Sequence, residues 1–196
     1  MPRRALSQLD IDSFRNSFCE KAFEIYQEQG YDAVSMRGVA KLLACSPMMA
    51  YRYFDNKEAV FAALRAMWFD RLTLELEAVD ENLSDFEYLR ELATAYAGFA
   101  RNNPHAYRLL YMVPVHQASD NPMVIRAQQG TRRVLLNATR RVVASGKIKG
   151  DPVVLAHTSW ASLHGLISLE LAHQLTQGAS FNQLFPAMLD SMLATG

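Results

Sequence analysis

Residues 30–57 contain two short helical patterns separated by a tight turn, and no other part of the chain constrains the fold as strongly. Ser35 is a residue type that caps helix N-termini, and Val34 and Val39 have the spacing of a hydrophobic staple across that cap. These signals predict a helix over residues 36–43. Its apolar residues recur at helical spacing, so we expect one face of the helix to be buried.

A second helix is predicted directly after a turn at Ala44 and Cys45. Ser46 is again a good N-cap, and Pro47 suits the first helical position because its φ is already helical and no amide proton is left without a partner. We expect this helix to cover residues 47–54. Two helices joined by such a turn form a helix-turn-helix, which places its second helix in the major groove of DNA.

The outward face of this second helix has the composition of a binding surface. Ala50 and Phe54 lie four residues apart and are expected to pack inward, whereas Met48 and Arg52 lie on the opposite side. Three further large side chains flank the outward pair: Met49, Tyr51 and Tyr53. An exposed surface of apolar, aromatic and cationic groups usually meets a partner.

The segment resembles the DNA-binding domain of the tetracycline-repressor (TetR) family of bacterial transcription factors. The resemblance rests on Gly-Tyr-x-Ala-Val-Ser-Met-Arg at 30–37, Val-Ala at 39–40, Ser46, and Tyr-x-Tyr-Phe-x-Asn-Lys-Glu at 51–58. It implies a homodimeric, ligand-responsive repressor. Such a protein binds a palindromic operator in double-stranded DNA and is released by a small-molecule effector.

The same resemblance implies an all-α fold of two domains. Residues 1–57 would form an N-terminal three-helix DNA-binding domain that contains the helix-turn-helix. Residues 58–196 would form a C-terminal helical domain for effector binding and dimerisation. The resemblance also implies phosphate contacts from the polar residues around the second helix and base contacts from residues 47–49, Arg37 and Arg52. The complete predicted DNA-binding set is Ser35, Arg37, Ser46, Pro47, Met48, Met49, Tyr51, Arg52, Tyr53 and Lys57.

This chain departs from the family pattern at two points. Ala44 stands in the turn where relatives often have glycine, which is unfavourable by about 1 kcal/mol if the position is left-handed. Met48 and Met49 stand where many relatives have a polar base reader. Methionine cannot form the bidentate hydrogen bonds that distinguish bases, but it can pack on thymine methyl groups. We therefore expect sequence reading to depend on Arg37, Arg52 and apolar contacts.

The rest of the chain is predicted to be a succession of helices. Their ranges are 12–29, 57–79, 85–102, 104–112, 122–145, 151–177 and a last helix ending near residue 193, with a loop at 114–121. The 151–177 helix is apolar almost all round, which indicates burial against its own core and against a partner subunit. With the last helix it would form a four-helix dimer interface, as the TetR resemblance implies.

The second half is similar to a subgroup of TetR C-terminal domains marked by Trp-x-x-x-His-Gly at residues 160–165. The candidate effector-binding residues are Trp68, Tyr96, Phe99, Tyr107, Tyr111, Trp160 and His164. Aromatic residues at helical spacing more often pack in a core than contact a ligand, so core packing stays open as the alternative for each. A carboxylate on an apolar helix is unfavourable alone, so Glu170 is expected to pair across the dimer or in the pocket.

The charge balance makes DNA binding depend on local placement. The chain has 20 basic and 20 acidic residues and a formal net charge of zero, so bulk attraction to DNA is excluded. A basic arm at residues 1–4 either reaches a minor groove or is disordered. Arg126, Arg133 and Arg140 recur every seven residues, which indicates a solvated helix face or a site for an acidic effector.

Other function classes find less support in the sequence. No G-x-S-x-G, P-loop or HExxH motif is present, so we expect no enzyme, catalytic residue, metal site or cofactor. A protein-interaction module that uses DNA as a scaffold stays open as the alternative. No membrane span or signal peptide is expected, and Cys19 and Cys45 do not form a disulfide framework, so a cytoplasmic protein is predicted.

Overall fold

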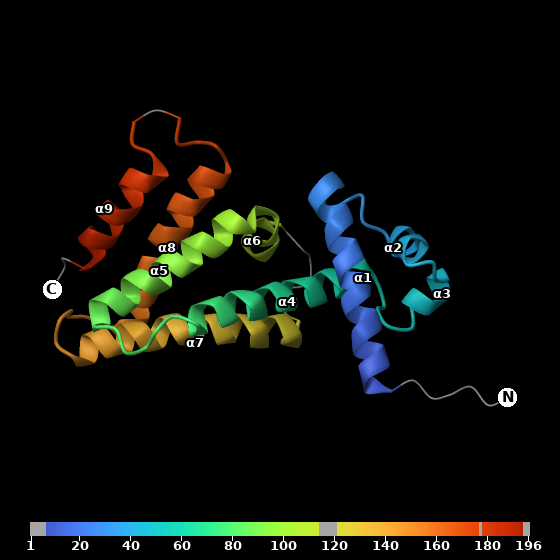
Figure 1. The fold of residues 1–196 in the computed structure, drawn as a ribbon, viewed down its shortest axis with the longest axis horizontal. Coiled ribbons are helices and arrows are strands. Elements are labelled where there is room, and N and C mark those ends of the chain that lie inside the picture. Colours follow the sequence, from blue (N-terminus) through green and yellow to red (C-terminus); the bar gives the residue numbers. More distant parts are fainter. Residues whose placement is uncertain (1–6, 114–120, 177, 194–196) are drawn as a thin grey trace. The chain divides into compact units, whose positions relative to one another are not determined.

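The computed structural model describes residues 7–113, 121–176 and 178–193. Every regular element in these ranges is a helix, which confirms the all-α class (Figure 1). The helices are α1 (Gln8–Gln29), α2 (Met36–Leu42), α3 (Pro47–Ala50), α4 (Lys57–Glu77), α5 (Asp85–Asn102), α6 (Pro104–Tyr111), α7 (Pro122–Ala144), α8 (Pro152–Leu171) and α9 (Phe181–Leu193). The basic arm at 1–4 and the predicted loop up to residue 120 lie outside the described residues.

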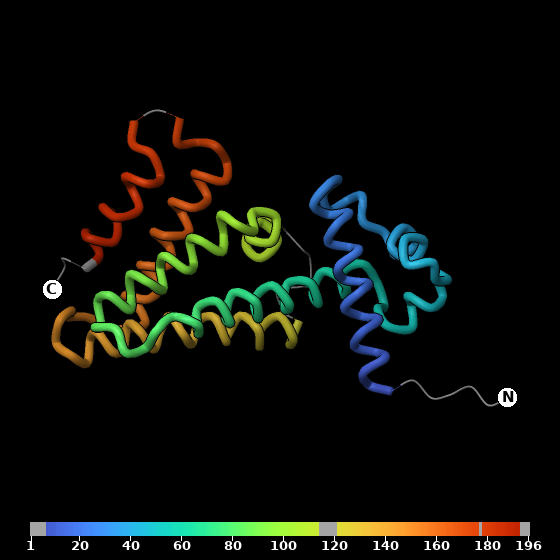
Figure 2. Tube along the Cα trace, viewed as in Figure 1, coloured from blue at the N-terminus to red at the C-terminus, as the bar shows by residue number. Residues whose placement is uncertain are grey.

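The helices fall into two compact units, and the path of the chain through each can be followed in Figure 2. The N-terminal unit contains α1, α2, α3 and the part of α4 up to Met67. The C-terminal unit contains α4 from Trp68, together with α5, α6, α8, α9 and α7 from Ala127. Compact units and independently folding domains are different things, so the domain boundary after Lys57 stays a prediction.

Side-chain caps start the helices of the N-terminal unit. The Ser35 hydroxyl accepts a hydrogen bond from the Gly38 amide at 3.1 Å, and the Ser46 hydroxyl accepts one from the Met49 amide at 3.2 Å, which confirms both predicted caps. The first helix begins at Gln8 rather than near residue 12, because Ser7 and Asp10 form a capping box.

The second helix of the helix-turn-helix is shorter than predicted. Helix α3 ends at Ala50, and residues 51–53 form a turn instead of continuing the helix to 54. The helix ends there because the backbone hydrogen bonds after Ala50 change from the α-helical pattern to a tighter one. The amides of Arg52 and Tyr53 bond to carbonyl oxygens three residues back, at 3.1 and 3.0 Å, which tightens the last turn.

A left-handed residue also ends α8 earlier than expected. The sequence predicted a helix to residue 177, but α8 stops at Leu171. His173 has a φ of 54°, and the Gln174 amide donates to the Leu169 carbonyl at 2.8 Å, which closes the helix C-terminus. Nothing in the apolar periodicity of this segment signals that turn.

Ala44, in the turn of the helix-turn-helix, has a φ of 50°. A left-handed alanine is unfavourable because its Cβ crowds the backbone, so Ala44→Gly is expected to raise the free energy of unfolding by about 1 kcal/mol. Urea denaturation followed by circular dichroism measures this change. Ala40→Gly, inside α2, is the control and should destabilise the protein instead. An Ala44→Gly protein no more stable than the parent would contradict the interpretation.

Arg141 near the end of α7 and Lys147 just after that helix bind the linker between α4 and α5 and the first residue of α5. Arg141 donates from Nε to the Asp85 carboxylate at 2.6 Å and from its two Nη atoms to the carbonyls of Glu81 and Leu83 at 2.7 and 2.5 Å. Lys147 contacts the other Asp85 oxygen at 3.1 Å. These interactions connect the C-terminal end of α7 to the beginning of α5.

Asp85 makes acid stability a test of this connection. Hydrogen bonds from Arg141, then Lys147 and Ser145, lower the pKa of Asp85 from 3.8 to about 2. The folded pKa lies below the unfolded one, so the stabilisation is present above pH 3.8 and is lost as the pH falls towards about 2. Thermal melting across this range should show a smaller loss of stability for Asp85→Asn than for the parent. Asp32→Asn, at an exposed position, should follow the parent; identical acid profiles for all three proteins would refute the assignment.

Candidate DNA-binding surface and effector cavities

The buried side of the helix-turn-helix is as the sequence predicted. Ala50 and Phe54 are buried, and the Phe54 ring centroid lies 5.4 Å from that of Phe18 on α1. Arg15, also on α1, places its guanidinium 4.3 Å from the Phe54 ring centroid and donates to the Tyr53 carbonyl. Arg15 therefore holds the turn after α3, a role for which the sequence carries no signal.

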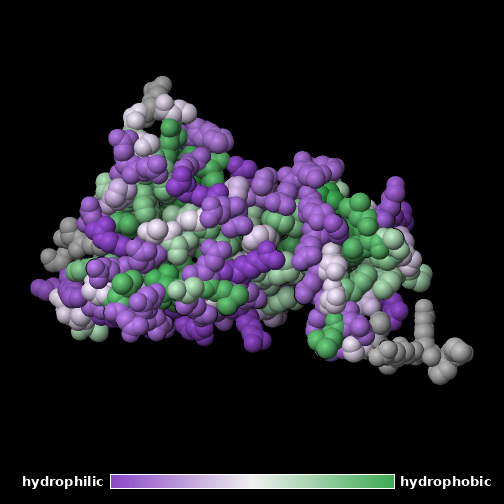
Figure 3. Space-filling view, viewed as in Figure 1, coloured by the Kyte–Doolittle hydropathy of each residue, from purple (hydrophilic) through white to green (hydrophobic). Residues whose placement is uncertain are grey.

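With Ala50 and Phe54 facing inward, the opposite side of α3 is open to solvent. Met48 is 78% exposed and Tyr51 is 51% exposed, and Arg52 is also exposed. Hydrophobic residues gather over α2 and α3 on the face drawn in Figure 3. Leu42 of α2 is 57% exposed and is a further exposed apolar residue of this unit. The exposed members of the predicted DNA-binding set are Ser35, Arg37, Ser46, Pro47, Met48, Tyr51 and Arg52, and the half-buried ones are Met49, Tyr53 and Lys57.

Two predicted phosphate contacts have roles within the protein as well. A Cβ on Gly38 would lie 2.9 Å from the Ser35 hydroxyl oxygen, so glycine leaves room for the cap of α2. The Ser35 hydroxyl accepts in that cap and keeps its own proton for a partner. Lys57 is the first residue of α4, and its Nζ lies 3.9 Å from the centroid of the Tyr31 ring. The Asn56 side chain caps the same helix by accepting from the Ala59 amide at 2.8 Å.

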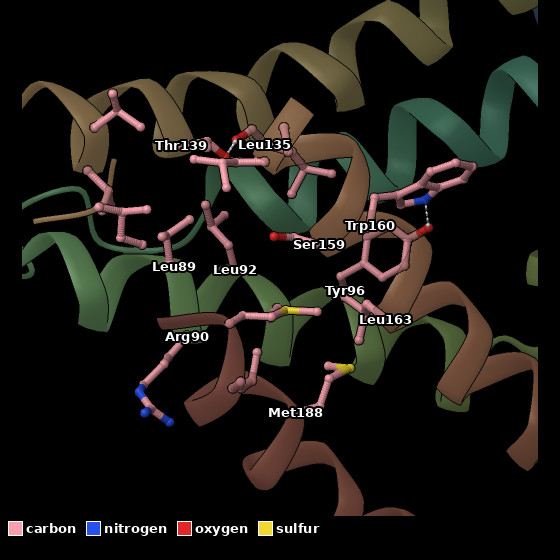
Figure 4. Close-up of a pocket in the computed structure, with 18 residues that line it drawn as sticks. Leu89, Arg90, Leu92, Tyr96, Leu135, Thr139, Ser159, Trp160, Leu163 and Met188 are labelled. Carbon is pink, nitrogen blue, oxygen red and sulfur yellow. Dashed lines mark hydrogen bonds between the residues drawn. The ribbon is translucent and has the colours of Figure 1, made fainter. Parts of the chain in front are cut away.

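The C-terminal unit contains an apolar cavity between α5, α7, α8 and α9, with about 840 Å³ of empty space that is partly open to solvent (Figure 4). Leucine, valine and methionine side chains dominate its walls, including Leu89, Leu92, Leu163, Met188 and Met192. Tyr96 and Trp160 also line it, and the Trp160 indole donates to the Tyr96 hydroxyl at 3.0 Å. We call this the apolar cavity.

A second cavity, of about 710 Å³, adjoins the first. Its walls include the polar side chains of Gln128, Arg132 and His157, together with Tyr111. Leu135, Ala156 and Trp160 line both cavities, so the two spaces meet at these three residues. We call the second space the polar cavity.

The seven predicted effector residues separate into three groups. Tyr96, Tyr111 and Trp160 line the cavities. Tyr107 and His164 line neither cavity and form a hydrogen-bonded pair beside Tyr111. Trp68 and Phe99 also line neither; both are buried, with ring centroids 6.1 Å apart in an edge arrangement. The alternative of core packing therefore describes Trp68 and Phe99 better than a ligand contact does.

The hydrogen bonds of His164 define its tautomer. Tyr107 Oη lies 2.7 Å from Nδ1, and the Ser168 hydroxyl, which donates to the His164 carbonyl, lies 3.4 Å from Nε2. The arrangement fits a neutral imidazole that accepts from Tyr107 at Nδ1 and carries its proton on Nε2. Burial lowers the pKa of His164, which favours the same neutral form.

Glu170 pairs within the chain, outside the predicted pocket. Its carboxylate lies 3.5 Å from the Arg101 guanidinium on α5, and neither residue lines a cavity. The expectation of a partner is confirmed by Arg101, which lines neither cavity, while pairing of Glu170 across a dimer stays a prediction. Of the arginine stripe, Arg133 contacts Glu77 at 3.3 Å, and Arg126 and Arg140 are exposed, which agrees with a solvated face.

Sequence reasoning missed most of the cavity wall, because it selected aromatic and polar residues. The apolar periodicity of residues 85–102 and the leucines and methionines near residue 190 were the available signals. In the ranges that the structure describes, no group of histidine, cysteine, aspartate or glutamate residues is arranged to hold a metal ion. No described helix combines the length and apolar character needed to cross a membrane.

Two family models match the chain. One, described as "Tetracyclin repressor-like, C-terminal domain", matches residues 89–192, and the other, "Bacterial regulatory proteins, tetR family", matches residues 19–64. The HTH-type transcriptional regulator UidR of Escherichia coli K12 is 22% identical over 192 residues, covering 95% of this chain and 96% of UidR. The uncharacterized HTH-type transcriptional regulator Rv0681 of Mycobacterium tuberculosis is 23% identical over 158 residues, covering 80% of this chain and 70% of Rv0681.

Solved structures show the same fold. The regulatory protein SCO4313 aligns with a TM-score of 0.79 and 24% identity, over 97% of this chain and 100% of that protein. FadR from Bacillus subtilis in complex with stearoyl-CoA aligns with a TM-score of 0.74 and 15% identity, over 92% of this chain and 98% of FadR. The C-terminal family model alone spans over half of the chain. The chain therefore belongs to the TetR family of DNA-binding transcriptional regulators.

Proposed function

We propose that this regulator is a homodimeric repressor, that it binds a palindromic operator through α3 and the turn after it, and that a small molecule in the C-terminal unit releases it. The observation that carries the proposal is the two-sided helix-turn-helix. Ala50 and Phe54 fix its inner side, while Met48, Tyr51 and Arg52 are presented to solvent. A rigid element with an exposed apolar and cationic face is what entry into a major groove requires.

The ten predicted DNA-binding residues divide by chemistry. In this proposal Ser35, Tyr51, Tyr53 and Lys57 hold phosphates, and Arg52 and the methionines reach base edges. Arg37 lies on the exposed side of α2 and serves both kinds of contact. Methionine side chains read thymine through its methyl group, so the operator should contain thymine opposite Met48.

The proposed dimer uses α8 and α9. Val154 on α8 is 62% exposed, and Val153 and Leu169 are exposed on the same helix. A partner copy would remove this apolar surface from water, and two paired helices from each copy make a four-helix interface. A two-fold dimer also presents two recognition elements, which a palindrome matches.

The proposed effector site is the pair of cavities. FadR of Bacillus subtilis, which shares this fold, holds stearoyl-CoA in its crystal structure, so the fold can enclose a ligand. Tyr96, Tyr111 and Trp160 are the members of the predicted effector set that line the space. We also propose that the chain belongs to the Trp-x-x-x-His-Gly subgroup. Trp160 of this motif lines both cavities, and His164 lines neither but stacks on the Trp160 ring. An effector releases DNA only by binding one conformation of the protein better than the other.

Selection of random duplexes on the purified protein tests the DNA-binding function. Enrichment of a palindrome bound at about 10⁻⁸ M or tighter at physiological salt supports it, since specific regulators bind in this range. A folded dimer that enriches no sequence from the random pool would refute it.

Two substitutions separate phosphate contact from base reading. Lys57→Ala should weaken binding to all duplexes alike and reduce the slope of log K against log salt by about 0.9, the value for one phosphate. Met48→Ala should instead reduce the preference for thymine over uracil, which lacks the methyl group, at the contacted positions. Fluorescence anisotropy on the selected duplex measures both. Leu42→Ala, on the exposed side of α2, is the control for lost apolar surface. A Lys57→Ala protein with an unchanged salt slope would contradict the assigned phosphate contact.

A further inference from the structure

We infer that the two cavities together accept an anionic amphiphile, a molecule with an alkyl chain and one negatively charged head group. The inference rests on the proposed function, because it names the chemical class of the effector. It follows from a difference in chemistry between two adjoining spaces within the C-terminal unit.

The polar groups of the apolar cavity are largely engaged with protein partners. Arg90 forms an ion pair with Asp190, and its side chain points away from the cavity in Figure 4. The Thr139 hydroxyl donates to the Leu135 carbonyl at 3.0 Å. Tyr96 accepts from Trp160 at 3.0 Å. A charged group placed here would find no counter-charge that is free to pair, so an alkyl chain is the group that fits.

The polar cavity offers the complementary chemistry. Arg132 and Gln128 line it, and in the described part of the chain neither side chain makes a hydrogen bond or ion pair. No acidic side chain is among the residues of its wall. His157 Nδ1 donates to the Val153 carbonyl at 2.8 Å, so Nε2 of the neutral ring can only accept, and the donors available to a head group are those of Arg132 and Gln128.

Arg132 differs from its neighbours on α7. Arg133 contacts Glu77 at 3.3 Å, and Arg141 contacts Asp85 at 2.6 Å, so these two guanidinium groups already have carboxylate partners. Arg132 is exposed, has no carboxylate partner among the residues that the structure describes, and lines a cavity. A guanidinium donates two parallel hydrogen bonds to a carboxylate or phosphate, which makes an anionic head group its natural partner.

The position of the shared wall allows one ligand to use both spaces. Leu135, Ala156 and Trp160 line both cavities and form their shared wall, so in this proposal one ligand places its head group at Arg132 on one side of that wall and its chain in the apolar cavity on the other. The chain of the same molecule would pass Trp160 and fill the space between the leucines and methionines.

Four probes with the same chain and different head groups test the inference on the full-length protein without DNA. They are decanoate, decyl phosphate, 1-decanol and decylamine, each titrated by isothermal calorimetry below its micelle concentration. We expect at least one of the two anions to bind roughly tenfold or more tightly than the alcohol, because a charge-assisted hydrogen bond forms only with the anion. Decylamine should bind most weakly. A preference for decanoate over decyl phosphate, or the reverse, supports the inference and identifies the head group.

Arg132→Gln should bring the anions to the affinity of 1-decanol and leave the alcohol unchanged. The matched control is Arg140→Gln, an exposed arginine on the same helix that lines neither cavity. Ala93→Phe, which fills part of the apolar cavity, should weaken decanoate and 1-decanol alike. In a Trp68→Phe background Trp160 is the remaining tryptophan, so a ligand that passes it should shift the emission spectrum.

Ligand-binding results that contradict the inference can be told apart from a failure of the proposed DNA-binding function. Equal binding of the anions and the alcohol, or unchanged binding after Arg132→Gln, would overturn the anionic head group and leave an apolar effector possible. Absence of binding by all four probes would overturn the amphiphile itself. Neither result bears on DNA recognition, which the duplex selection measures without any effector.

Discussion

Phe54→Ala is expected to unfold the helix-turn-helix and abolish specific DNA binding, with a loss of about 3–5 kcal/mol in the free energy of unfolding. Phe54 is 2% exposed, and its ring packs on Phe18 of α1. The guanidinium of Arg15 lies 4.3 Å from the centroid of the Phe54 ring. The same guanidinium donates to the Tyr53 carbonyl and so holds the turn after α3. Removal of the ring leaves a cavity and releases that turn, so the exposed residues of α3 lose their fixed orientation.

Chemical denaturation and operator titration measure the two parts of this expectation. Leu42→Ala is the matched control, because Leu42 is an apolar residue of the same unit that is 57% exposed. It should change stability by less than about 0.5 kcal/mol. A Phe54→Ala protein that keeps both its stability and its operator affinity would show that the aromatic packing does not support the DNA-binding surface.

Tyr107→Ala is expected to lower the stability of the C-terminal unit by a similar amount, about 3–5 kcal/mol. Tyr107 is fully buried, and its ring meets those of Tyr96, Tyr111 and His164 at centroid distances of 5.9, 5.0 and 5.6 Å. Its hydroxyl also supplies the proton accepted by His164 Nδ1. The substitution therefore removes core volume and leaves a polar nitrogen without its donor.

Tyr107→Phe separates the two contributions, because it keeps the ring and removes only the hydroxyl. Its expected loss is about 1–3 kcal/mol, the penalty for an unsatisfied polar group. Differential scanning calorimetry of both variants measures the change, with Leu74→Ala at a 65% exposed position of α4 as the control. Equal losses for the two variants would mean that the hydrogen bond, and not the packing, dominates at Tyr107.

The helix-turn-helix was predictable because its signals are local. An N-cap such as Ser35 or Ser46 acts on amides three residues away, and Pro47 acts on its own backbone, so the sequence alone fixes where α2 and α3 begin. The end of α3 was not predictable in the same way. It depends on Arg15 of α1, which holds the Tyr53 carbonyl from a distant part of the chain.

The effector cavities were less predictable, because a cavity is a space left between helices and has no sequence period of its own. Trp68 and Trp160 are both tryptophans on apolar helices, yet one is buried against Phe99 and the other lines both cavities. Which of them meets a cavity depends on how four helices pack together. Arg132 and Arg133 differ similarly: they are adjacent in sequence, but within the described ranges only Arg133 contacts a carboxylate.

The position of Lys57 over the Tyr31 ring affects the affinity expected for every duplex. In the proposed complex a DNA phosphate must draw the ammonium away from a ring that lies 3.9 Å from it. Such a contact is worth about 0.5–1 kcal/mol, or roughly two- to fivefold in affinity. Because the ring competes with every phosphate equally, it weakens operator and random sequence by one factor and leaves their ratio unchanged. In the proposed complex Tyr31 is thus a competitor within the protein that lowers the affinity for every duplex by the same factor, without altering which one is preferred.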